Sequence, residues 1–182
     1  MPAAPAFPTV RLHFKVLWEP TVPRADMVAA MQQTYAAVGI SVAVASQEDL
    51  KHLTTMAELD VGGCETEGEL TDEEDKLFEC RKYAHPDQTC VYFVRSLSPP
   101  VYCGCGTRKA KLPGFKDGRP SVVIGARATR WTLGHECGHV LGIGHVPQTD
   151  RLMYERTSQI TSPVPVLTAA EGATMKKSQF LR

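Results

Sequence analysis

The sequence predicts an α/β (α+β) domain built on a twisted mixed sheet. Strand-like apolar segments alternate with helix-like segments along the chain, which is the pattern of such a fold. The length of 182 residues suits one domain with a substantial core. The formal net charge is zero, so the composition gives no reason to expect nucleic acid or an anionic membrane surface as a partner. No apolar stretch approaches the length of a transmembrane helix.

The N-terminal part predicts a strand, a helix and a second strand. Residues 11–18 (RLHFKVLW) alternate between polar and apolar side chains, as in a half-buried strand. Pro23 begins a helical stretch at about 24–38, because proline suits the first turn of a helix. Residues 40–45 (ISVAVA) predict a second, more buried strand.

An acidic, cysteine-containing insertion is expected at about 46–89. Within it, residues 64–79 hold eight acidic side chains and one lysine, and a short helix is expected near 71–81. The composition favours a solvated surface insertion. A cation site or a docking surface for a basic partner remains an alternative, although the alternating oxygen ligands of a calcium loop are missing.

The C-terminal part predicts two strands and two helices. Residues 90–96 (CVYFVRS) and 121–126 (SVVIGA) are apolar enough for strands. A helix is expected at about 129–141, and a last helix near 169–179 begins with the spacing of a capping box.

The most informative motif is HECGHVLGIGH, at residues 135–145, which begins in the helix expected at about 129–141. Residues four apart share one face of a helix, so His135 and His139 can reach the same metal ion. Glu136 lies beside that face and can contact a metal-bound water. Gly142 accepts the left-handed backbone that ends a helix, and the turn brings His145 back as a third ligand.

Three histidine ligands leave one coordination position open, which is typical of a catalytic Zn²⁺ site. One zinc ion would lower the pKa of its bound water to about 7. Glu136 would act as general base and then as general acid toward the leaving amine. The motif therefore predicts a zinc-dependent endopeptidase that acts on protein or peptide substrates. A monomer is expected.

The sequence after this motif resembles the metzincin metalloproteases. Met153, in the run RLMYER, follows His145 at the distance at which these enzymes carry the methionine of their Met-turn. The local sequence of residues 129–155 is most similar to that of the matrixin branch. The resemblance implies a metzincin-like catalytic domain at 11–182, with Met153 as the hydrophobic floor of the site. Two departures are the missing histidine- and aspartate-rich metal loop and Glu155 in place of a proline.

Substrate is expected to lie extended along an exposed sheet edge. Chain order and the family resemblance suggest the strand Ser121, Val122, Val123, Ile124 and Gly125 as that edge. Tyr154, one residue after Met153, is a further candidate contact, and residues 154–164 are expected to wall the specificity pocket.

The cysteines predict one or two disulfides, which would suit an extracellular or exported protein. Cys137, inside the motif, is expected to be buried as a small apolar residue. Alternatives are a second zinc bound by four of the other cysteines and a cysteine of the CGCG run at 103–106 that caps the catalytic zinc. A disulfide is expected to join Cys64 or Cys80 to Cys103 or Cys105, and the zinc alternative involves Cys80, Cys90, Cys103 and Cys105.

Two other functions stay open. Zinc chemistry does not itself require a peptide substrate, so an amidohydrolase acting on a non-protein compound is one alternative. A catalytically silent binding module stabilised by zinc is the other. The Pro- and Ala-rich residues 1–10 predict a flexible lead-in without the features of a signal peptide.

Overall fold

The computed structural model describes residues 7–109 and 119–181. A five-stranded sheet has the order β2-β1-β4-β7-β6, in which β6 runs antiparallel to β7 and the other neighbours are parallel. Its strands are β1 (Thr9–Val16), β2 (Ser41–Asp49), β4 (Thr89–Val94), β6 (Gly104–Thr107) and β7 (Ser121–Gly125). A small parallel sheet pairs β3 (Glu58–Asp60) with β5 (Ser96–Ser98). The α/β prediction is confirmed.

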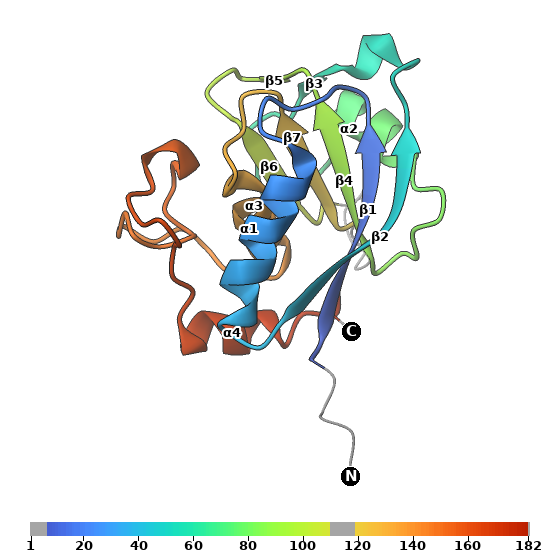
Figure 1. The fold of residues 1–182 in the computed structure, drawn as a ribbon. Coiled ribbons are helices and arrows are strands. Elements are labelled where there is room, and N and C mark those ends of the chain that lie inside the picture. Colours follow the sequence, from blue (N-terminus) through green and yellow to red (C-terminus); the bar gives the residue numbers. More distant parts are fainter. Residues whose placement is uncertain (1–6, 110–118, 182) are drawn as a thin grey trace.

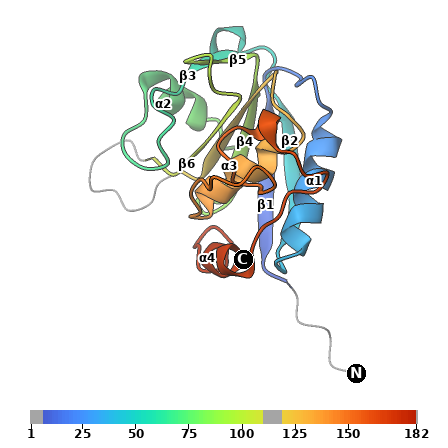
Figure 2. The same cartoon turned by 90° about the vertical axis from the view of Figure 1, so that its left-hand side faces the viewer.

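The helices are α1 (Arg24–Ala36), α2 (Asp72–Phe78), α3 (Thr132–Val140) and α4 (Ala169–Met175), with short 3₁₀ turns η1 (Thr54–Met56) and η2 (Thr157–Gln159). Helices α1 and α3 cover one face of the sheet, and α2 with the small sheet covers the other (Figures 1 and 2). Each face therefore has its own apolar core. Among the described residues, no helix has the length and apolar character needed to cross a bilayer.

Helix α1 positions α3, the helix that carries the motif. Its buried face includes Met31 and Tyr35, and the hydroxyl of Tyr35 donates to the carbonyl of Gly134 at 2.8 Å. An added Cβ at Gly134 would already lie 3.6 Å from Met31. The two helices thus pack closely, and one buried hydrogen bond fixes α3 along its axis.

Two expectations for the N-terminal part are wrong in detail. Strand β2 is the edge strand of the sheet, and apart from the buried Val42 its side chains are partly buried or exposed, so it is not the more buried strand. Thr9 and Val10 belong to β1, and Val10 is buried, so the lead-in predicted at 1–10 is too long. Its residues 1–6 lie outside the described residues.

The acidic insertion contributes a core of its own. Its helix α2 begins at the capping box formed by Thr71 and Glu74 and buries Leu77 and Phe78 against the sheet. Glu74 is also buried, and the ammonium group of Lys109 lies 3.2 Å from its carboxylate. The expectation of a merely solvated surface segment is therefore wrong for α2, because its inner face carries large apolar side chains.

Candidate metal centre and active-site cleft

Three histidine nitrogens converge at the end of α3. His135 and His139 lie one turn apart on the helix, and Gly142, with a φ of 96°, ends it as expected. The chain then brings His145 back. The Nε2 atom of His139 lies 3.1 Å from that of His135 and 3.1 Å from that of His145, and the third pair is 3.3 Å apart. Of the described residues, these three are the group that could hold a metal ion.

The other ring nitrogens fix the tautomer of two of these histidines. Nδ1 of His135 donates to the carbonyl of Leu152 at 2.9 Å, and Nδ1 of His139 donates to that of Ile143 at 3.0 Å. Burial, reinforced by the neighbouring histidines, lowers the pKa of His135 to about 3 and that of His139 to about 4. Both rings are therefore neutral at neutral pH and direct an Nε2 lone pair toward the third ring.

The geometry fits a tetrahedral zinc ion. Zn–N bonds of about 2.0–2.1 Å at tetrahedral angles place ligand nitrogens about 3.3–3.4 Å apart, close to the spacing of the three Nε2 atoms. Two of the rings are held by second hydrogen bonds to backbone carbonyls, a feature of metal-binding histidines. Without a cation, facing lone pairs at this distance would repel each other.

Met153 packs beneath the helix that carries the ligands. It is fully buried, and its backbone carbonyl accepts a hydrogen bond from Val146 N–H at 2.9 Å. A Cβ at Gly138 would meet its sulfur at 2.6 Å and the side chain of Ile143 at 3.2 Å. Gly138 thus makes room for Met153 directly against α3, one residue before the ligand His139.

Glu136 lies between α3 and the edge strand β6. Burial raises the pKa of its carboxyl to about 8, while a hydrogen bond from Gly106 N–H opposes that shift. A Cβ at Gly104 would meet the Glu136 carboxylate at 2.7 Å, and one at Gly106 would meet its backbone carbonyl oxygen at 2.1 Å. These two glycines let the strand lie directly on the helix.

This role of β6 was not predicted from the sequence. Only one of its four residues, Thr107 of GCGT, is β-branched, and the run lacks the polar–apolar alternation that predicts a strand. The signal present was glycine at alternating positions, which in a strand marks the close approach of another backbone.

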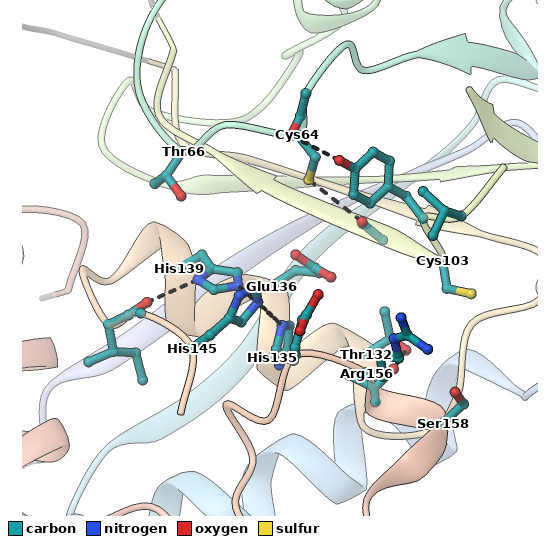
Figure 3. A pocket seen from close by; sticks show the side chains of 18 of the residues that line it. Cys64, Thr66, Cys103, Thr132, His135, Glu136, His139, His145, Arg156 and Ser158 are labelled. Carbon is teal, nitrogen blue, oxygen red and sulfur yellow. Dashed lines mark hydrogen bonds between the residues drawn. The ribbon is translucent and has the colours of Figure 1, made fainter. Parts of the chain in front are cut away.

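A cleft of about 830 Å³ opens over the histidines. Figure 3 shows the triad and Glu136 on one side of it and Cys64, Thr66 and Cys103 on the other. The lining residues come from four segments, 63–67, 101–108, 132–145 and 155–158. The cleft thus lies between α3 with the loop after Met153 and the edge of the sheet.

The segment Gly63–Glu67, here called the strap, is fastened to the edge of the sheet. Cys64 forms a disulfide with Cys105 of β6. The hydroxyl of Tyr102 donates to the carbonyl of Gly63 at 3.1 Å, and Arg108 N–H donates to that of Thr66 at 2.7 Å. The acidic insertion therefore supplies one wall of the cleft.

This disulfide decides between the alternatives for the cysteines. Cys64 with Cys105 is one of the expected pairings, and it rules out a second zinc that uses Cys105 as a ligand. Cys137 is buried, as expected, and burial raises the pKa of its thiol. Cys103 has a free thiol that lines the cleft, but it is not part of the histidine group that could hold a metal.

The expectation of an exposed edge at Ser121–Gly125 is wrong. Strand β7 pairs with β4 on one side and β6 on the other, and all of its residues are buried. Its apolar run reflects burial on both faces, which is typical of an interior strand. Tyr154 does not line the cleft either, and its hydroxyl lies 3.4 Å from the side-chain oxygen of Gln159.

Comparisons with known proteins show the fold. No family model and no curated protein matches the sequence. Among solved structures, metalloproteinase-II from Bacteroides fragilis aligns with a TM-score of 0.64 and 16% identity over 96% of this chain. The chain covers 54% of that protein, about half its length. Archaemetzincin from Methanopyrus kandleri aligns with a TM-score of 0.52 and 14% identity over 93% of this chain and 95% of its own. The chain thus has a metallopeptidase-type fold.

Proposed function

We propose that this protein is a zinc-dependent endopeptidase of the metzincin type that cleaves protein or peptide substrates. The observation that carries the proposal is the convergence of three Nε2 atoms, each within 3.3 Å of the others, in an open cleft that also holds Glu136. The likeness to archaemetzincin supports the clan. The similarity to the matrixin branch is confined to the amino-acid sequence of residues 129–155, so it remains a local resemblance.

His135, His139 and His145 would hold the zinc ion, which when bound supplies Lewis acidity toward water and the scissile carbonyl. Glu136 accepts a proton from the attacking water and delivers it to the departing amine. Its buried position favours this exchange, because burial raises the pKa of its carboxyl to about 8 while Gly106 N–H still stabilises the ionised form.

The substrate would lie along β6. The carbonyl of Cys103 accepts a hydrogen bond from Gly125 N–H, so the backbone groups of Gly104 and Gly106 point away from β7. Of these groups, Gly106 N–H already bonds Glu136. Gly104 lines the cleft beside Glu136. An extended peptide added to this edge would place its backbone across the catalytic carboxylate.

The test is digestion of a denatured protein mixture by the zinc-loaded chain, with and without a zinc chelator. Glu136→Ala should retain one zinc and lose nearly all cleavage, whereas the control Glu69→Ala changes an exposed glutamate outside the cleft and should keep it. Full activity of Glu136→Ala would refute the assignment of the base.

The same experiment separates the alternatives. Chelator-sensitive hydrolysis of a small non-peptide amide without cleavage of any polypeptide would indicate an amidohydrolase. Zinc-dependent thermal stabilisation without turnover of any amide would indicate a binding module. We also propose an exported location, supported by the Cys64–Cys105 disulfide. Reduced thiols at these two residues in protein isolated from its native source would contradict it.

A further inference from the structure

Arg156 stands out among the charged residues of the cleft because no carboxylate of the described residues pairs with its guanidinium. The other arginine that lines the cleft, Arg108, is paired: its guanidinium lies 2.6 Å from the carboxylate of Glu67. Arg156 lines the cleft, is exposed, and forms no ion pair with any carboxylate in the described ranges. It is therefore available to a ligand.

The backbone of Arg156 is held in place although its side chain is free. Its carbonyl accepts a hydrogen bond from Gln159 N–H at 2.9 Å, which begins η2. The next residue, Thr157, shares a 2.9 Å hydrogen bond with Thr132 on α3. Thr132 precedes Glu136 by about one helical turn. Figure 3 shows Arg156 beside Thr132, between His135 and Ser158.

The other charges near the cleft leave a positive site at Arg156. The charge of Arg108 is balanced by Glu67 on the strap. Glu155 lines the same cleft but forms no ion pair with Arg156, so it leaves the guanidinium uncompensated. A guanidinium on a fixed wall offers two parallel N–H donors, which match a carboxylate more closely than any neutral group.

We propose that Arg156 determines specificity by binding a carboxylate of the peptide substrate at one fixed position next to the scissile bond. The inference rests on the proposed peptidase function. The carboxylate is either the side chain of Asp or Glu or the C-terminal carboxylate of a short peptide. Both present the same two oxygens, so one guanidinium serves either.

The test compares cleavage of matched peptides by the zinc-loaded chain. One set carries Asp, Asn or Ala near the cut bond and ends in an amide; the other has only neutral side chains and ends in a free carboxylate or an amide. We expect one of the carboxylate-bearing sets to be cleaved with about 10- to 100-fold higher kcat/KM than its neutral analogue, as for one charge-assisted bidentate contact. The set that responds identifies the source of the carboxylate.

The variants assign the effect to Arg156. Arg156→Gln should remove the preference, so that the carboxylate-bearing peptide and its neutral analogue are cleaved with equal kcat/KM, and Arg156→Glu should shift the preference toward a Lys analogue. Arg11→Gln, the same change at an exposed arginine of β1 outside the cleft, should retain the preference. Cleavage by the unaltered chain with no carboxylate preference, or a preference that survives in Arg156→Gln, would overturn the inference.

A binding measurement keeps this result distinct from the proposed function. In the zinc-loaded Glu136→Gln variant, calorimetry should show tighter binding of the carboxylate-bearing peptide than of its amide. Adding Arg156→Gln should abolish that difference. Equal binding of both peptides would refute the role of Arg156. The complete absence of chelator-sensitive cleavage by the unaltered chain would instead count against the peptidase function.

Discussion

Replacement of Gly106 by alanine tests the close contact between β6 and α3. The added Cβ would lie 2.1 Å from the carbonyl oxygen, 2.9 Å from the carbonyl carbon and 3.1 Å from the Cα atom of Glu136. All three are backbone atoms, so no rotamer change can relieve the overlap. The strand and the helix must move apart by about 1 Å to restore ordinary van der Waals separation.

The expected loss of stability follows from this overlap. Overpacking a close-packed interior costs about 1–3 kcal/mol, and a clash with backbone belongs at the upper end. Alanine also lowers the conformational entropy of the unfolded chain, which offsets about 0.5–1 kcal/mol of this loss of stability. The net loss is then about 2 kcal/mol, which lowers Tm by about 4–8 °C for a chain of this size.

Thermal melting of the zinc-loaded protein measures this change. Gly144→Ala is the matched control, because its Cβ would have no neighbour within 4 Å, and its Tm should stay level or rise slightly. Gly104→Ala separates stability from catalysis: its Cβ meets side-chain atoms of Glu136 and Thr132 at 2.7 Å, so it should displace the carboxylate and reduce kcat more than Tm. A Gly106→Ala protein that melts within about a degree of the unaltered chain would refute the described contact.

Two further predictions concern the rest of the domain. Replacing Cys64 and Cys105 together by serine opens a loop with a sequence separation of 41 residues, which should cost about 3–4 kcal/mol by chain entropy; melting should show the loss, whereas Cys103→Ser, at a free thiol, should not. His13 bonds Ser46 and Gln88, and burial lowers its pKa below 6.5. The folded state thus prefers neutral His13, so its contribution is fully present above pH 6.5 and is lost as pH falls toward the folded pKa. Denaturant unfolding at several pH values should give a shallower acid-side decline for His13→Gln, and an unchanged slope would contradict this role.

Much of the metal centre could be predicted because its information is local. The spacing of His135, His139 and Gly142 predicts two histidines on one helical face and an abrupt end to the helix, and the structure shows both features. The apolar segments that became β1, β4 and β7 were also recognisable, since burial requires apolar side chains wherever a strand lies in a core.

The walls of the cleft could not be predicted because they depend on contacts between distant segments. Strand β6 forms because it pairs with β7, and its glycines allow the close approach of Glu136. Its own side chains predict neither contact. The position of the edge is likewise a property of the whole sheet: the apolar run at β7 predicts a strand but does not say that β6 pairs outside it. The strap is joined to the wall of the cleft by one disulfide. The positions of the cysteines in the sequence were compatible with several pairings.

The arrangement of the centre also separates two steps in its assembly. All three ligand histidines lie within residues 135–145, so capturing the ion requires only a short loop to close, at a small entropic cost. The hydrogen bond from Gly106 to Glu136 and the strap wall join segments far apart in the chain, and such contacts form late because long loops must close first. In the proposed enzyme, metal binding would therefore precede assembly of the complete site during folding, and substitutions could reshape the walls of the cleft without removing the histidines.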